Sequence, residues 1–247
     1  SYMDEFAEVH GKDVVVREAL AGQVPSAGVG TCFSRRAMIE LLKSGDGIPF
    51  DTQSLTEDYD IGFRLKEKGL KEVFVRFPAT TKTEDDWSSQ SHFGMNYRAS
   101  QVLCVREYFP ATVSAAIRQK SRWIIGIVFQ GYKTHGWTKS WILNYFLWRD
   151  RKGVIANFAS FAAMLILFQV SALWLYQTFW PGAYHFMSVF SENPILVALF
   201  WLNMYLFANR VFQRIYFVTI YYGIFQGALS IPRLVWGNYI NFMANCR

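Results

Sequence analysis

The amino-acid sequence predicts an α/β domain followed by a lipid-embedded helical region. Residues 1–152 carry 21 of the 25 Lys and Arg residues and 18 of the 19 Asp and Glu residues. A water-soluble surface needs charge at about that density, and residues 153–247 do not have it. Residues 153–191 contain no Asp, Glu, Lys or Arg at all, which excludes an ordinary soluble surface there.

Two kinds of apolar pattern predict that the first part mixes helices and strands. Residues 1–24 are polar around a short apolar run and are expected to be helical or irregular. Apolar residues at helical spacing predict helices, and short apolar runs predict buried strands. The expected helices cover residues 35–43, 56–69 and 112–132, and the expected strands cover residues 73–75 and 102–105.

The second part is expected to enter the membrane in stages. Residues 140–151 combine bulky aromatic side chains with a closing basic cluster, which is typical of a helix lying in the membrane interface. Val154–Tyr176 is long and apolar enough to span a bilayer. Two shorter apolar runs follow at residues 194–208 and 215–231, and the two Arg residues within 209–214 are expected to mark a turn at the lipid surface.

Net charge and the scattered Cys and His residues exclude some classes of partner. The net charge of +6 comes without a dense Lys/Arg run, so nucleic acid is not an expected partner. Anionic lipid headgroups near the basic residues at 149–152 are, and the positive-inside rule places that cluster in the cytoplasm. The three Cys and four His residues lack the spacing of a metal site, so no metal ligands are assigned.

The first candidate for chemistry is the string Thr56-Glu57-Asp58. Thr is a favoured N-cap residue, and carboxylates in the first turn suit the helix dipole. A carboxylate at that place can accept a proton from an attacking hydroxyl within hydrogen-bond reach. On its own, however, the string is more typical of an ordinary capped, acidic helix start.

The second candidate is the string Gln119-Lys120-Ser121-Arg122-Trp123. Gln119 and Arg122 are three residues apart on the expected helix, and Trp123 lies four after Gln119, so the three are expected on neighbouring turns of one face. An Arg side chain grips phosphate oxygens with two parallel hydrogen bonds, and an indole covers the apolar face of a sugar ring. The alternative is an amphipathic helix with a snorkelling Arg and an interfacial Trp.

In combination with a glycine-bearing turn at residues 30–36, the two strings resemble the processive, membrane-embedded members of glycosyltransferase family 2, such as cellulose and hyaluronan synthases. The resemblance rests on the order of these strings and on the apolar region after them. It implies a cytosolic GT-A domain, an α/β sandwich with a Rossmann-like sheet, on interface and membrane helices. The expected segments are residues 1–138 as the acceptor half of that domain, 139–152 as an amphipathic interface helix, and 153–247 as transmembrane and interfacial helices.

The resemblance also implies roles for the residues of these strings. Asp58 is expected to be the general base that deprotonates the acceptor hydroxyl in a single inverting displacement from a UDP-sugar. Gln119 and Arg122 are expected to hold the pyrophosphate, and Trp123 to support the acceptor sugar. The further substrate-binding residues that it implies are Glu57 and Thr56 beside the base, and Gly30, Thr31 and Cys32 in the turn bordering the acceptor.

One departure from the family pattern concerns the nucleotide and the metal. Such enzymes also carry an Asp for the uracil and an Asp-x-Asp motif for Mg²⁺ or Mn²⁺, and neither precedes residue 25. Asp58-Tyr59-Asp60 has the spacing of that motif but belongs to the expected base helix, and Asp85-Asp86 fits a solvated surface. The cation is therefore expected in the complete enzyme with ligands outside this chain, and the chain alone is expected to be an inactive fragment.

These observations are compatible with two functions. The first is a multi-pass glycosyltransferase of the bacterial inner membrane, with its catalytic part in the cytoplasm, that extends a glycan in exopolysaccharide synthesis beside an outer-membrane export or receptor partner. The alternative is a non-catalytic, membrane-anchored scaffold or receptor-assembly subunit, which the missing nucleotide half favours. A transporter is disfavoured, because one clear span with few polar groups offers little for a substrate path. The sequence does not identify the donor sugar or the linkage.

Overall fold

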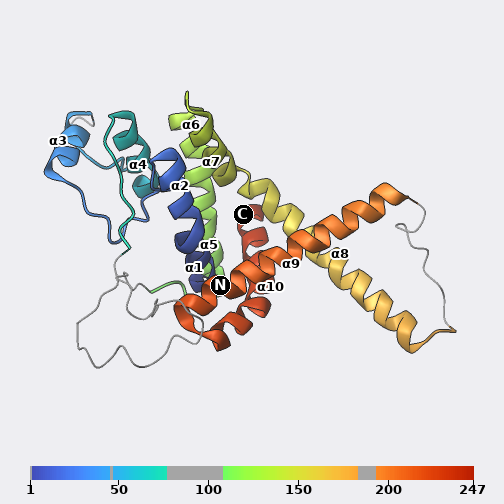
Figure 1. The fold of residues 1–247 in the computed structure, drawn as a ribbon. Coiled ribbons are helices and arrows are strands. Elements are labelled where there is room, and N and C mark those ends of the chain that lie inside the picture. Colours follow the sequence, from blue (N-terminus) through green and yellow to red (C-terminus); the bar gives the residue numbers. More distant parts are fainter. Residues whose placement is uncertain (1, 45–46, 77–107, 183–192) are drawn as a thin grey trace.

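The structure, a computed structural model, describes residues 2–44, 47–76, 108–182 and 193–247 (Figure 1). Within these ranges the ordered elements are helices, and no strand is present. The first part contains α1 (Tyr2–Glu8), the π-helical segment η1 (Val9–Asp13), α2 (Val14–Ala21), α3 (Arg35–Ser44) and α4 (Glu57–Glu67). The rest contains α5 (Val113–Ile124), the π-helical segment η4 (Ile125–Gln130), α6 (Gly131–His135), α7 (Trp141–Arg151), α8 (Gly153–Phe179), α9 (Pro194–Tyr222) and α10 (Ile224–Cys246).

The strand expected at residues 73–75 is not formed, which corrects the α/β prediction for the described part of the chain. A strand needs a neighbour to receive its backbone hydrogen bonds, and no described segment forms a strand ladder with these residues. Val73 and Val75 are consequently exposed. The second expected strand, at residues 102–105, lies outside the described residues.

The N-terminal residues fold as a nearly continuous rod of α1, η1 and α2. Gly22 ends this rod in the left-handed region (φ 58°), and its N–H donates to the Glu18 carbonyl at 2.8 Å. Figure 1 shows the rod beside α5, with the N-terminus close to α9 and α10. The expectation of a helical or irregular segment at residues 1–24 therefore resolves to helix over most of its length.

Helices α3 and α4 confirm two predictions and pack on each other. Ala37 and Leu41 of α3 form an apolar cluster with Ile61 and Leu65 of α4. Helix α4 begins directly after Thr56 and is followed by a glycine turn, as its sequence predicts. The Thr56 side chain makes no capping hydrogen bond, however, because it is buried against another helix, as described below.

The expected helix at residues 112–132 is present as the unbroken run of α5, η4 and α6. The Thr112 hydroxyl accepts a hydrogen bond from the Ala115 N–H at 3.3 Å, so this N-cap does satisfy a free backbone donor. The turns of η4 are wider than those of an α-helix. Such π segments cost hydrogen-bond geometry and occur frequently at functional sites.

Helix α7 confirms the helix expected at residues 140–151. Ser140 caps it by accepting from the Leu143 N–H, and Leu143 and Leu147 pack against Tyr59 and Phe63 of α4. Its opposite side exposes bulky aromatic side chains, namely Trp141, Tyr145 and Trp148. The location of this helix in a membrane interface stays a prediction.

Two helices, α8 and α9, are long and apolar enough to cross a membrane. Helix α8 contains the predicted span Val154–Tyr176. Figure 1 shows that α8 and the first half of α9 extend away from the other helices. No side chain in the apolar stretches of these two helices is buried among the described residues, which is consistent with a lipid environment.

The turn expected at residues 209–214 is wrong, because α9 runs straight through it. Arg214 is buried, and its Nε donates to Glu8 Oε2 at 2.8 Å. The carboxylate of α1 neutralises the guanidinium inside the protein, so the chain need not turn to bring this charge to the lipid surface. The next interruption comes at Gly223 (φ 85°), and α10 then continues through Pro232.

Acidic residues of α1 hold the last two helices against the first part of the chain. Arg233 of α10 grips the fully buried Asp4 through Nε and Nη2, at 2.8 and 2.9 Å. Lys120 of α5 contacts both carboxylate oxygens of Glu5 at 2.7 Å. Residues 1–138 and 153–247 are therefore in direct contact, and the expected segment boundaries stay a prediction.

We expect Arg214→Met to lower the free energy of unfolding by roughly 3 kcal/mol, because it removes the main partner of a buried carboxylate. Glu8 would keep only its longer contact to Lys12, at 3.4 Å. The measurement is chemical unfolding in detergent micelles, followed by tryptophan fluorescence. Lys43→Met is the control, since it breaks the exposed pair of Lys43 and Glu40, for which the expected loss is much smaller because water screens the two charges. Equal losses would contradict the stabilising role of the buried pair.

Candidate active site

Asp58 lies in the first turn of α4, half-buried beneath the small-residue loop of residues 25–31. Its Oδ1 accepts a hydrogen bond from the Tyr59 N–H at 2.8 Å. Its Oδ2 faces Gly28, where a Cβ would stand 3.2 Å from that oxygen. Gly28 also has a φ of 78°, so the loop approaches the carboxylate in a conformation that favours glycine.

The environment of Asp58 shifts its proton affinity in a definite direction. Burial raises the pKa of the Asp58 carboxyl above its usual value, and the neighbouring Glu57 charge raises it further. The Tyr59 N–H and the charge of Arg122 act in the opposite direction and lower this pKa. A carboxylate with a raised pKa is a stronger base than an exposed one, and Arg122 limits how far this pKa rises.

Arg122 and Gln119 lie three residues apart on α5, within one face of this helix. Arg122 is exposed, and its charge lowers the pKa of the Asp58 carboxyl. Gln119 is half-buried, and its Oε1 has no hydrogen-bond partner among the described residues. The charge of Arg122 thus acts on Asp58 although the two residues are 64 positions apart in the chain, and within the described part of the chain no hydrogen bond or ion pair joins them.

Trp123 has a different environment from Asp58 and Arg122. Its indole makes edge-on contacts with Tyr2 and Phe6 of α1, at centroid distances of 5.8 and 6.4 Å. It also lines a cavity that neither Asp58 nor Arg122 lines. Gln119, Arg122 and Trp123 were expected on one face of α5. Trp123 instead lies on a neighbouring surface of this helix, toward α1 and the cavity.

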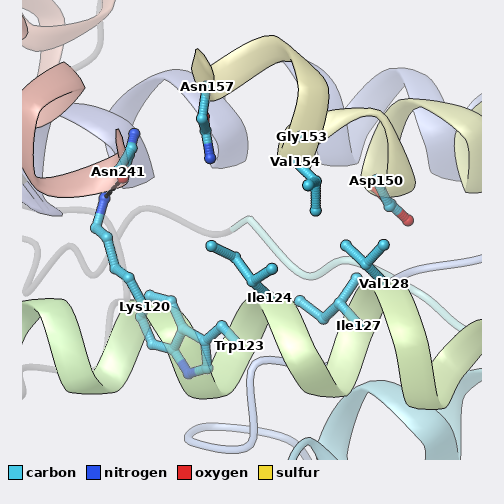
Figure 2. A pocket seen from close by; sticks show the side chains of 10 residues that line it. All are labelled: Lys120, Trp123, Ile124, Ile127, Val128, Asp150, Gly153, Val154, Asn157 and Asn241. Carbon is cyan, nitrogen blue, oxygen red and sulfur yellow. Dashed lines mark hydrogen bonds between the residues drawn. The ribbon is translucent and has the colours of Figure 1, made fainter. Parts of the chain in front are cut away.

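The cavity beside Trp123 has a volume of about 170 Å³. Figure 2 shows apolar side chains of α5 and η4 pointing toward the start of α8, with polar groups around them. Lys120 at its edge is occupied, since its ammonium contacts Glu5 and Asn241, each at 2.7 Å. The remaining polar lining residues are Asp150 and Asn157. The cavity thus combines an indole, aliphatic walls and a few polar groups at the junction with a membrane-length helix.

The start of α4 packs closely on η4. This contact fixes the position of the first turn of α4, which carries Asp58. Thr56 is buried directly against Gly126, where a Cβ would overlap the Thr56 side chain. The Leu55 N–H donates to Gln130 Oε1 at 2.9 Å. One turn further along α4, Asp60 Oδ1 lies 2.7 Å from the buried His135 Nε2.

The loop residues expected near the acceptor follow Gly28, which faces Asp58, and their own placement beside Asp58 stays a prediction. Gly30 has a φ of 76°, and the Thr31 and Ser26 hydroxyls are 2.7 Å apart. The Cys32 thiol is free and exposed. The first part of the loop is anchored by Glu72, whose Oε2 accepts from the Val24 N–H, and burial raises the pKa of this carboxyl to about 7.

The described residues do not offer a site for the divalent cation expected of the complete enzyme. Asp58 and Asp60 have a suitable sequence spacing, but Asp58 faces the Gly28 loop whereas Asp60 pairs with His135 and Arg64. Among residues 2–44, 47–76, 108–182 and 193–247, no group of three His, Cys, Asp or Glu side chains could hold a metal ion. Asp85 and Asp86 lie outside the described residues.

Three residues with a direct part in this arrangement were not singled out from the sequence. Tyr59 donates its phenol to Asp150 Oδ2 at 2.7 Å, and Arg17 Nη1 donates to the same oxygen at 2.8 Å. Tyr59 and Asp150 are 91 positions apart, and Arg17 and Asp150 are 133 apart. Local sequence carries no signal for such contacts, except that a buried Arg requires a carboxylate somewhere.

Comparison with known proteins assigns this chain to a family. The family described as "Glycosyl transferase family group 2" matches residues 1–176. The chain belongs to this family. It is also 64% identical over 247 residues to "Bacteriophage adsorption protein B" of Escherichia coli (strain K12) and to "Bacteriophage N4 adsorption protein B" of Escherichia coli O157:H7. No solved structure matches the chain.

The two Escherichia coli relatives are much longer than this chain. The matches cover 100% of this chain but only 33% of each relative, so the chain spans about a third of the curated relatives it matches. Family membership confirms the resemblance seen in the two strings and indicates a GT-A fold and a glycosyltransferase-like role.

We expect Gly126→Ala to lower the free energy of unfolding by roughly 1–3 kcal/mol, because the added methyl must displace Thr56 and the start of α4. Chemical unfolding in micelles measures the change. Gly153→Ala is the matched control, since a Cβ there meets nothing within 4 Å, and it should stay within about 0.5 kcal/mol. A Gly126→Ala protein as stable as the control would show that α4 does not pack on η4 as described.

Proposed function

We propose that the protein containing this chain is an inner-membrane glycosyltransferase that transfers a sugar from a UDP-sugar to a growing glycan, with Asp58 as general base. The observation that carries the proposal is the position of Asp58. Its half-buried carboxylate has a raised pKa, lies under the Gly28 loop and interacts with Arg122. Membership of a glycosyltransferase family supports this function. Glycosyl transfer needs a base for the acceptor hydroxyl and a positive charge near the leaving diphosphate, and Asp58 and Arg122 are the candidates for these two roles.

In the proposed reaction, Asp58 accepts the proton of an acceptor hydroxyl while that oxygen attacks the anomeric carbon of the donor sugar. The bond between this carbon and the diphosphate oxygen breaks, and the diphosphate leaves with the electron pair. Attack opposite to the leaving group inverts the configuration at the anomeric carbon. Arg122 is placed to neutralise the developing negative charge, and the Gln119 amide to donate to a phosphate oxygen.

The cavity beside Trp123 supports a place for the glycan acceptor. An indole flanked by aliphatic and amide side chains is suited to the alternating apolar and hydroxyl-bearing surfaces of a sugar. Because the cavity adjoins the start of α8, an acceptor in it would lie where the chain reaches the predicted membrane surface. We also propose that Thr56, Glu57, Gly30, Thr31 and Cys32 border the acceptor beside Asp58.

A role in exopolysaccharide synthesis is part of the same proposal. Phage adsorption, named for the two Escherichia coli relatives, concerns the cell envelope, where a surface glycan or its export partner would lie. The second candidate function is a non-catalytic, membrane-anchored scaffold for a phage receptor, which the names of the two relatives favour. Catalysis by the complete protein separates the two candidates.

The decisive experiment is Asp58→Asn in the complete protein. We expect sugar incorporation from a panel of radiolabelled UDP-sugars to fall by at least about 100-fold, because general-base catalysis is lost. Membrane insertion should be unchanged. Glu67→Gln, at the exposed far end of the same helix, is the control and should keep its activity. Full incorporation by Asp58→Asn would refute the base, and none by the wild type with any donor would favour the scaffold.

The pH dependence of activity provides an independent test of Asp58. Since Arg122 lowers the pKa of Asp58, Arg122→Gln should raise that pKa, and the acidic limb of the rate profile should move to higher pH. The Glu72 titration should stay in place, because the charges that act on Glu72 are Arg17 and Lys66. Arg118→Gln, with its side chain one turn earlier and bonded to Ser114, is the control. An acidic limb that does not move in Arg122→Gln would exclude Asp58 as its source.

A further inference from the structure

We propose that Asp150, near the end of α7, is a positioning residue for the base Asp58 and acts through Tyr59. This inference rests on the proposed function. No step of the proposed reaction requires Asp150 to touch substrate. Its contacts nevertheless connect the base-bearing helix to the start of α8, and those contacts are specific enough to be tested.

The connection consists of two charge-assisted hydrogen bonds to one oxygen atom. The Tyr59 phenol donates to Asp150 Oδ2 at 2.7 Å, and Arg17 Nη1 donates to the same atom at 2.8 Å. Tyr59 is 7% exposed and Arg17 is 4% exposed. Hydrogen bonds to an ionised acceptor are shorter and stronger than neutral ones, so this pair fixes the phenol oxygen in space.

The surroundings make this position rigid. The Tyr59 ring packs with Phe63, Leu143 and Leu147 in one apolar cluster. The Arg17 guanidinium lies over the Phe63 and Phe146 rings, each with its centroid at 5.7 Å. A polar group displaced inside such a cluster loses its hydrogen bonds without gaining water, so small movements of Tyr59 are costly.

Tyr59 links this rigid anchor directly to the base. Its own backbone N–H donates to Asp58 Oδ1 at 2.8 Å, while its side chain reaches Asp150 on the other side of α4. The N–H bond orients the Asp58 carboxylate and lowers its pKa. A shift of Tyr59 therefore changes both the direction and the proton affinity of the base.

The anchor lies at the junction with the membrane-length helix. Asp150 belongs to the last turn of α7, and α8 begins at Gly153. Asp150 also lines the cavity beside Trp123, as Figure 2 shows. The base-bearing helix and the proposed acceptor cavity therefore share Asp150 as one fixed point of contact.

The test uses Tyr59→Phe and Asp150→Asn in the complete protein, with Asp13→Asn as the matched control. Tyr59→Phe removes only the hydroxyl and leaves the Arg17 pair intact, so it is expected to fold even if Asp150→Asn does not. Asp13→Asn weakens a neighbouring ion pair of the same helix, with Arg149 at 3.2 Å, and does not touch Tyr59. Rates are normalised to folded, membrane-inserted protein, and kcat, KM and the pH profile are measured with the donor that the wild type uses.

We expect Tyr59→Phe to lower kcat by roughly tenfold to a hundredfold with an unchanged KM for the donor, as for a misplaced catalytic group. The acidic limb should move to higher pH as the Tyr59 N–H bond to Asp58 weakens, while Glu57 and Arg122 remain as the neighbouring charges. Asp13→Asn should change neither quantity. A merely structural role would reduce the amount of folded protein without moving the pH limb.

The outcomes separate this inference from the function on which it rests. If Asp58→Asn abolishes transfer but Tyr59→Phe keeps the wild-type kcat and pH profile, Asp150 does not position the base. If Asp58→Asn itself stays active, the proposed base is wrong, whatever the Tyr59 variant does. A kcat loss and pH shift in Tyr59→Phe, reproduced by any folded Asp150→Asn protein, would establish the connection.

Discussion

The ion pairs between the acidic residues of α1 and the basic residues of three later helices are the constraint on which the remaining arrangement depends. Asp4, Glu5 and Glu8 neutralise Arg233, Lys120 and Arg214, which come from α10, α5 and α9. Breaking one partner of a buried pair leaves an uncompensated charge, so the three helices are held to α1 together. This arrangement lets α9 continue through Arg214, brings Tyr2 and Phe6 against Trp123, and fixes one wall of the cavity.

The site itself depends on a second level of organisation, the packing of α4 between η4 and α7. Gly126 permits contact with Thr56 on one side, and Asp150 binds Tyr59 on the other. Asp58 lies between Thr56 and Tyr59 in the sequence. Its backbone is therefore held on both sides, and its carboxylate has little freedom to move. The base is thus positioned by its neighbours in the chain. Gly28 covers it from the loop of residues 25–31 and can come close because glycine has no side chain.

The sequence was sufficient where local interactions decide the structure. The helix after Thr112, the helix after Ser140 and the membrane-length α8 follow from caps and apolar patterns that neighbouring residues determine. The interruption expected near Arg214 was wrong because its charge is satisfied by Glu8, 206 positions away. The pairing of Asp58 with Arg122 came from a family resemblance, and the division of Trp123 onto another surface depends on α1, which no local pattern reveals. The strand at 73–75 likewise needs a neighbouring strand that the described residues do not provide.

Opposing influences on Asp58 explain why a base at this site would be both buried and paired. Burial raises the pKa of the Asp58 carboxyl and makes its carboxylate a stronger base. Full exposure to Arg122 and to solvent would lower this pKa and make a weaker base. Burial is the largest influence, so the pKa stays raised, while the Tyr59 N–H and the charge of Arg122 limit the rise. In the proposed reaction, a donor diphosphate bound to Arg122 would remove part of that cation's influence on Asp58. Asp58 would then be a stronger base when the leaving group is in place, and proton transfer would be coupled to donor binding.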